Sequence, residues 1–187
     1  MTAKPNEIDP GARIHDDEEP VLDVSGYGTL PVPPSDLAGT ILSAMTPEEK
    51  TNFNNLLGLL QAWSESACGT PGLLLHPQAR ASLWGAALAK MADHFRETGH
   101  DDRALFFVGA AWNISKHPIF AFNAALLSFN AGDTMRAKSL LQDYLAAYQG
   151  VLKNSALMLA SPEISSEDLE TLAVSARSRL AAIEGQT

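Results

Sequence analysis

The chain has 187 residues, 45% of them hydrophobic, with a formal net charge of −9 and one cysteine. Such acidity argues against a nucleic-acid partner, because that surface needs clustered Lys and Arg to neutralise phosphates. A single cysteine excludes an intrachain disulfide and a cysteine zinc cluster. No uncharged stretch reaches the ~18 to 20 residues of a membrane span, and the N-terminus lacks an apolar signal core. We expect a cytoplasmic protein without stable membrane insertion.

The stretch 1–34 combines many prolines with an acidic run at 16–19 and has no apolar periodicity. This composition predicts a disordered, acidic, Pro-rich tail. An alternative is a short interaction segment at 21–30 that docks on a partner or folds back on the domain. Residues 35–187 are predicted to form one all-helical domain.

Helix-start signals follow this tail. Ser35 and Asp36 predict a short helix that ends near residue 45. Thr46 and Glu49 then form a capping box, in which each side chain accepts from the backbone N–H of the other. The helix that follows is predicted for 47–66, since its apolar residues repeat at helical spacing. Its stripe consists of Phe53, Leu56, Leu57, Leu60 and Trp63.

Turn signals divide the next part into two helical hairpins. Gly99 is expected in the left-handed conformation that ends a helix, and Gly132 with Asp133 is expected to make the next turn. Pro118 opens the helix between them, and Asp133 is the expected N-cap of the one after. The helix over 119–131 is apolar nearly all round, as expected for a central helix with neighbours on both sides. The four helices are predicted at 77–98, 101–116, 119–131 and 135–154.

A final amphipathic helix follows Ser165, which with Asp168 forms its predicted N-terminal cap. Its apolar face consists of Leu169, Leu172, Ala173, Ala176, Leu180 and Ile183. A helix of this kind covers the last exposed apolar surface of a helical stack. The whole chain is therefore predicted to be all-α, with about seven helices.

The two hairpins share one sequence frame. The string Gly99-His-Asp-Asp-Arg-Ala104 recurs 33 residues later as Gly132-Asp-Thr-Met-Arg-Ala137. This period is typical of helix-turn-helix units that stack because none buries its apolar face alone. The sequence thus predicts a short helical solenoid, with clear repeats at 85–117 and 118–150.

This frame resembles the tetratricopeptide repeat, whose small residues recur at fixed positions. The matching alanines are Ala92, Ala104 and Ala111 in the first repeat and Ala125 and Ala137 in the second. There are departures: Pro118 comes two residues late, and the usual aromatic residue is Phe95 in the first repeat but Ser128 in the second. Tyr144 occupies a position where the repeat usually has alanine, and the helix from residue 47 does not fit the frame.

A narrower resemblance covers roughly residues 80 to 184. The strings at 117–125, 131–138 and 168–183 are similar to the last repeat and C-terminal helix of the class II translocator chaperones of bacterial type III secretion. The resemblance implies a small cytoplasmic chaperone that holds an apolar or extended client segment in a concave groove. A general tetratricopeptide adaptor or assembly subunit, binding a soluble protein, is the alternative. A homodimer is compatible with either.

In a tetratricopeptide stack the first helix of each repeat lines the concave face, so the resemblance also places the groove. The second repeat would supply Ile119, Phe122, Leu126 and Phe129, with Asn123 and Asn130 beside them. The first repeat would supply Ala86, Ala89, Asp93 and Arg96. An apolar stripe at helical spacing fits a protein core equally well, so that alternative stays open for the four apolar residues of the second repeat.

Catalytic patterns are absent from the sequence. The histidines, His15, His76, His94, His100 and His117, show no spacing typical of metal ligands. Cys68 lies beside a glycine, without a nearby base in the sequence. There is no phosphate-binding loop and no nucleophile elbow. We therefore expect no enzyme, no cofactor and no metal site.

Overall fold

The computed structural model describes residues 21–24, 28–31, 36–68, 77–152 and 165–185. This part of the chain contains seven α-helices, which confirms the all-α prediction, and in addition one short β-hairpin. The helices are α1 (Asp36–Ser43), α2 (Pro47–Cys68), α3 (Pro77–Glu97), α4 (Asp101–Ser115), α5 (Pro118–Asn130), α6 (Thr134–Leu152) and α8 (Ser166–Glu184). Their bounds lie within a few residues of the predicted ones.

A β-hairpin lies inside the stretch that was predicted to be a disordered tail. Strand β1 (Val21–Val24) pairs antiparallel with β2 (Gly28–Pro31), so that Val21 faces Pro31 and Val24 faces Gly28. Strand β1 also contacts α2. Strands β1 and β2 are thus part of the described structure, and β1 lies against α2. The acidic run at 16–19, Ser35, His15 and His76 lie outside the described residues.

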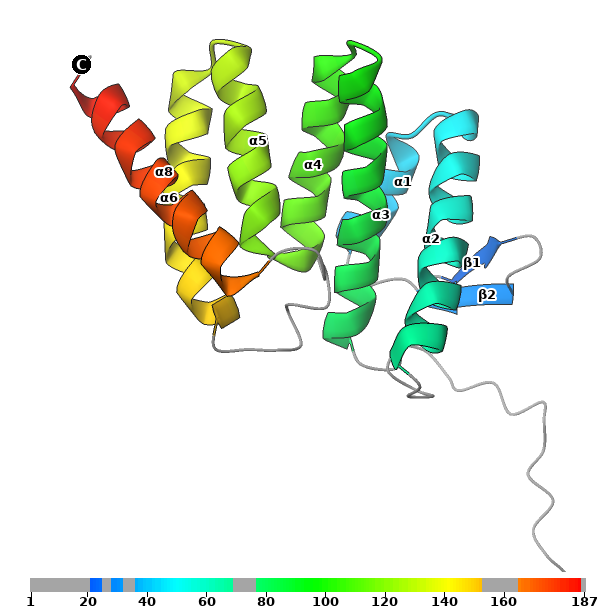
Figure 1. The fold of residues 1–187 in the computed structure, drawn as a ribbon. Coiled ribbons are helices and arrows are strands. Elements are labelled where there is room, and N and C mark those ends of the chain that lie inside the picture. The colour runs from blue at the N-terminus through cyan, green and yellow to red at the C-terminus, as the bar shows by residue number, and fades with distance from the viewer. Residues whose placement is uncertain (1–20, 25–27, 32–35, 69–76, 153–164, 186–187) are drawn as a thin grey trace, which may run out of the picture.

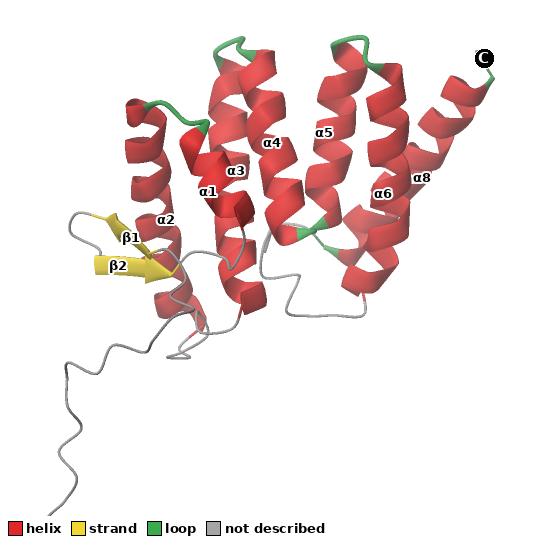
Figure 2. Cartoon of the chain, turned by 180° about the vertical axis from the view of Figure 1, so that it is seen from behind, coloured by secondary structure: helices red, strands yellow, loops and turns green. Residues whose placement is uncertain are grey.

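The helices pack mainly against their neighbours in sequence, from α2 on α3 through to α6 on α8. Two further contacts join α1 to α4 and α5 to α8. Views from opposite sides show two layers, with α2, α3, α5 and α8 in one and α1, α4 and α6 in the other (Figures 1 and 2). The α3–α4 and α5–α6 turns lie at the same edge of the molecule (Figure 1).

Both predicted capping boxes form. The Thr46 N–H donates to Glu49 Oε2 over 2.7 Å, and the Glu49 N–H donates to Thr46 Oγ1 over 3.2 Å. At α8 the Ser165 N–H donates to Asp168 Oδ2, and the Asp168 N–H donates to Ser165 Oγ. Two otherwise unpaired N–H groups are satisfied at each helix start. Short-range sequence signals therefore fix where α2 and α8 begin.

Both turn glycines have a positive φ, as predicted from the sequence for Gly99. Gly99 has φ of +77° and Gly132 has φ of +82°, a region that residues with a Cβ rarely occupy. After the second turn, Asp133 Oδ1 accepts from the Arg136 N–H over 3.0 Å and caps α6. Each hairpin therefore closes through the same glycine turn.

Helix α5 is shared by two hydrophobic cores. The first core joins it to α1, α2, α3 and α4, and there the Phe53 and Trp84 rings lie 5.0 Å apart. The second core joins it to α6 and α8. Phe120 points into the first core and Ala121 into the second. This dual packing explains why the sequence of α5 is apolar nearly all round.

The alanines of the repeat frame are buried where helices approach one another. Their exposed fractions are 6% or less for Ala92, Ala104, Ala111, Ala125 and Ala137. Small side chains at these positions allow close contact between helix backbones. In the part of the chain that the structure describes, no helix is both long and apolar enough to cross a membrane.

Candidate partner-binding face

One stripe of α5 lies at the surface, at the border between the two cores. Asn123 and Asn130 are exposed, and Leu126 between them is partly buried. Leu126 packs against the second core, whereas its neighbour Leu127 packs against the first. The stripe therefore lies on the outer side of α5, between the two cores, as expected for side chains spaced three and four residues apart.

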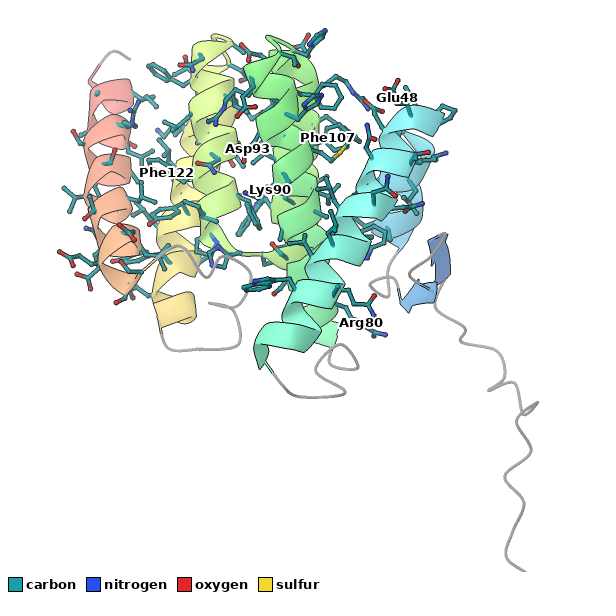
Figure 3. All side chains as sticks on the ribbon, turned by 45° about the vertical axis from the view of Figure 1, so that its right-hand side comes forward. Glu48, Arg80, Lys90, Asp93, Phe107 and Phe122 are labelled. Carbon is teal, nitrogen blue, oxygen red and sulfur yellow. The ribbon has the colours of Figure 1, made fainter. Side chains whose placement is uncertain are left out.

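Two apolar residues of the predicted groove are buried in the protein itself. Ile119 is 8% exposed and packs in the first core, and Phe122 is 4% exposed and packs in the second. The Phe122 ring meets the Tyr144 ring edge-on at 5.4 Å and lies between α5 and α8 (Figure 3). Burial thus favours the core interpretation of these two residues. They do not form an open apolar groove, because neighbouring helices cover them.

Phe129 behaves differently from Ile119 and Phe122. Its side chain is 46% exposed near the end of α5, one turn from Leu126. Phe129 is therefore the most exposed of the four apolar residues predicted for the second-repeat groove.

The outer side of α3 is polar. The Asp93 and Arg96 side chains, both at least half exposed, form an ion pair of 3.3 Å. Lys90 is exposed one turn before Asp93, and both lie on the viewer's side of Figure 3. Ala86 and Ala89 are partly buried beside them. An exposed pair of this kind stabilises the fold little, so its charges remain available to a partner.

These residues define one surface, which we call the α3–α5 face. It consists of Ala86, Ala89, Lys90, Asp93, Arg96, Asn123, Leu126, Phe129 and Asn130. Helices α3 and α5 lie in the same layer (Figure 1), and an added Cβ on Gly85 of α3 would lie 3.0 Å from the Phe120 ring of α5. Lys90 was not among the residues predicted for the groove. Its spacing of four from Ala86 and three from Asp93 nevertheless places it on the same side of the helix.

Tyr144 holds the terminal helix in place. Its side chain is fully buried, and its hydroxyl donates to the Leu169 carbonyl in α8. Burial, together with the neighbouring Tyr148, raises the pKa of Tyr144 to about 12, although Arg177 opposes the rise. Arg177 of α8 in turn donates to the Tyr148 hydroxyl over 2.9 Å. The departure from alanine at Tyr144 thus has a structural reason, because it anchors α8.

Glu49 and Arg103 form a two-pronged ion pair between α2 and α4. Arg103 Nε donates to Glu49 Oε1 over 2.9 Å, and Nη2 donates to Oε2 over 2.5 Å. The guanidinium also lies 4.7 Å from the centre of the Phe106 ring. Burial alone would raise the pKa of Glu49, but hydrogen bonds from Arg103 and Thr46 outweigh it and hold that pKa below 4.5. This pair fixes the N-terminal helices to the first hairpin.

The described histidines do not gather into a site. His94 and His100 are exposed, and His117 is buried at the start of α5. Within the described ranges, no group of three or more His, Cys, Asp or Glu side chains is placed to hold a metal ion. Cys68 is the last residue of α2.

Comparisons of the chain with protein-family models, with curated proteins and with solved structures found no match. The residues of the α3–α5 face and the sequence resemblance are therefore the features that bear on function.

Proposed function

We propose that the chain is a tetratricopeptide-type chaperone that holds an extended segment of a client protein across the α3–α5 face. The observation that carries this proposal is the exposed stripe of Asn123, Leu126 and Asn130 on α5. A carboxamide both donates and accepts hydrogen bonds, as a peptide group does. Two of them on one helix side can therefore pair with a client backbone whatever its side chains are.

The spacing of the stripe suits an extended peptide. Asn123 and Asn130 are separated by seven residues, which corresponds to a rise of about 10.5 Å along a helix. Three residues of an extended chain span about 10 Å. Both carboxamides can therefore reach peptide groups of one extended segment, while Leu126 and the half-exposed Phe129 contact its apolar side chains.

Several features support a tetratricopeptide-like stack as the scaffold. The frame glycines have positive φ, the frame alanines are buried, and successive helices pack against each other. The resemblance to translocator chaperones supplies the class of client, an apolar segment of a secreted protein, and with it the cytoplasmic location. Net charge of −9 favours a client segment without excess negative charge.

The burial of Ile119 and Phe122 favours a second candidate function, that of an adaptor for a folded, soluble protein. With these side chains covered, Lys90 and the Asp93–Arg96 pair make up a large part of the face. Charged residues of this kind are typical of the polar rim of transient interfaces. Such an adaptor would use the same face without holding an unfolded segment.

The test introduces Arg at Asn123 and Asn130 together. The matched control introduces Arg at Asn113 and Gln142, which are exposed on α4 and α6 in the other layer. Each variant is co-expressed with the products of the adjacent reading frames. We expect the face variant to lose co-purification of an otherwise insoluble client, while the control retains it and both melt like the unmodified chain.

The outcomes separate the candidates. A partner that is folded and soluble without this chain supports the adaptor. If the face variant binds the client as well as the control does, the α3–α5 face is not the binding surface and the proposal is overturned.

A further inference from the structure

His117 lies at the junction between the two hairpins. It is the N-cap of α5 and only 1% exposed. Its backbone N–H donates to Ser115 Oγ over 3.1 Å, and that hydroxyl donates to the Ala111 carbonyl over 2.8 Å. Its ring lies 5.7 Å from the Phe120 ring. The junction is thus a connected, buried unit.

Helix α3 closes the junction from the other side. A Cβ added to Gly85 would lie 2.7 Å from Ser115 Cβ and 3.0 Å from the Phe120 ring. These distances are too short for a methyl group, so the end of α4 and the start of α5 are in tight contact with α3. The His117 ring, which is 1% exposed and lies beside Phe120, is therefore buried next to this tight contact.

Within the described residues, nothing accepts a hydrogen bond from His117 Nδ1, as a positively charged ring would require. That atom is buried. A protonated imidazole carries N–H groups on both nitrogens, so a charged donor would face no acceptor. The ring also lies at the N-terminus of α5, where the helix dipole disfavours a cation.

Neighbouring charges offer no compensation. Helix α5 carries no charged residue, and the adjacent Lys116 is a cation whose Nζ lies 5.0 Å from the Trp112 ring centre. The other charged residues of the helices packed at this junction are Arg80, Lys90, Asp93, Arg96, Glu97, Asp101, Asp102 and Arg103. Burial is what lowers the pKa of His117, from 6.5 to about 4, with no contribution from a carboxylate.

We propose that His117 is an acid-sensitive lock between the two hairpins. In its neutral form it completes the packing of α3, α4 and α5, and once protonated it leaves the junction and separates α5 from the first hairpin. This inference goes beyond the proposed function and does not depend on it. If the α3–α5 face binds a client, the same event would part the two sides of that face.

The sign of the pH dependence follows from the lowered pKa. In the closed form, with α5 packed on the first hairpin, the pKa of His117 is about 4. In the open form, with α5 separated, His117 has its ordinary pKa of 6.5 and binds a proton below about that pH. Between these values the open form holds more protons, so the equilibrium constant for the closed form falls by up to about tenfold per pH unit as the pH drops. Stability is complete above pH 6.5 and is lost towards pH 4.

The experiment compares the full chain with His117→Asn and His100→Asn. Asn is neutral and a favourable N-cap. His100 is the matched control, because it is the N-cap of α4 but is exposed. Urea unfolding from pH 7.5 to 4.5 is followed by tryptophan fluorescence. We expect unmodified chain and His100→Asn to lose stability below pH 6.5, and His117→Asn to lose only what ordinary carboxylates contribute.

An unchanged pH slope in His117→Asn overturns the proposal. If that variant does not fold, NMR titration of the His117 ring in the unmodified chain decides instead. A pKa near 6.5, with no faster amide exchange at the start of α5 in acid, also overturns it. A pKa well below 6.5 with faster exchange there supports it.

Discussion

The hairpins α3–α4 and α5–α6 share one sequence frame but are bonded differently to the rest of the protein. Near its turn the first hairpin stacks Phe95 on Phe107, with ring centres 5.3 Å apart, and its Arg103 pairs with Glu49. In the second hairpin the residue equivalent to Phe95 is Ser128, whose buried hydroxyl has no hydrogen-bond partner in the described part of the chain. The first hairpin therefore has the more strongly packed turn.

The equivalent arginines show the same contrast. Arg103 forms its ion pair with Glu49 of α2. Arg136 is exposed, and its Nη2 lies close to Gly109 of α4, 3.6 Å from where a Cβ on that glycine would be. The second hairpin is instead tied to the terminal helix through Tyr144. The comparison teaches that the frame determines turns and close helix contacts, and that the residues outside it determine which neighbour each hairpin holds.

The largest effect on stability is expected from a variant that breaks the attachment of the second hairpin to α8. Tyr144→Ala removes a fully buried ring and the hydrogen bond to the Leu169 carbonyl. Truncation of a buried aromatic residue typically costs about 3 to 5 kcal/mol in the free energy of unfolding. Urea denaturation measures the loss, and hydrogen exchange should show α8 opening first. Tyr144→Phe keeps the ring and should cost only about 1 to 3 kcal/mol.

The next effect contrasts two glycines of the first hairpin, Gly85 of α3, which faces Ser115 and Phe120, and Gly109 of α4, which faces Arg136. Gly85→Ala would place its Cβ 2.7 Å from Ser115 and should cost about 1 to 3 kcal/mol through overpacking. Gly109→Ala has only the end of the Arg136 side chain at 3.6 Å, so helix propensity should stabilise the fold by about 0.5 to 1 kcal/mol. Thermal melts of the pair measure both. Equal shifts would contradict the tight junction at Gly85.

The smallest effects on stability are expected from variants that test the contacts of the two arginines. Glu49→Gln leaves Arg103 without its carboxylate and should cost about 1 to 2 kcal/mol, less than a fully buried pair because Arg103 is one-third exposed. Arg136→Gln should change stability by less than about 0.5 kcal/mol. Because the pKa of Glu49 is lowered, its stabilisation is complete above pH 4.5 and is lost as the pH falls below that value. Denaturation at pH 7 and pH 3 checks both statements, since Glu49→Gln should cost less at the lower pH.

Local chemistry explains what could be predicted from the sequence. Thr46, Ser165, Gly99 and Gly132 act on residues a few positions away, so their capping bonds and turns follow from the chain itself. The Glu49–Arg103 pair joins residues 54 positions apart, and no pattern in the sequence links them. Long-range ion pairs of this kind depend on how helices stack, and the sequence alone does not specify that.

The exposure of the candidate residues could be predicted only in part, for the same reason. Asn123, Asn130 and Phe129 are exposed as expected, because their surroundings depend mainly on α5 itself. Phe122 is covered because Tyr144 draws α8 against α5, and that tertiary contact has no counterpart in helical periodicity. In the sequence, Tyr144 is marked only as a departure from the alanine of the repeat.

The sharing of α5 between the two cores has a consequence for how the chain melts. Neither half can retain its interior if the other is removed. A fragment that ends before Pro118 would expose the side of α3 and α4 that packs on α5. A fragment that begins at Pro118 would expose the side of α5 that packs in the first core. The protein should therefore lose its structure in a single cooperative transition, with no independently stable piece on either side.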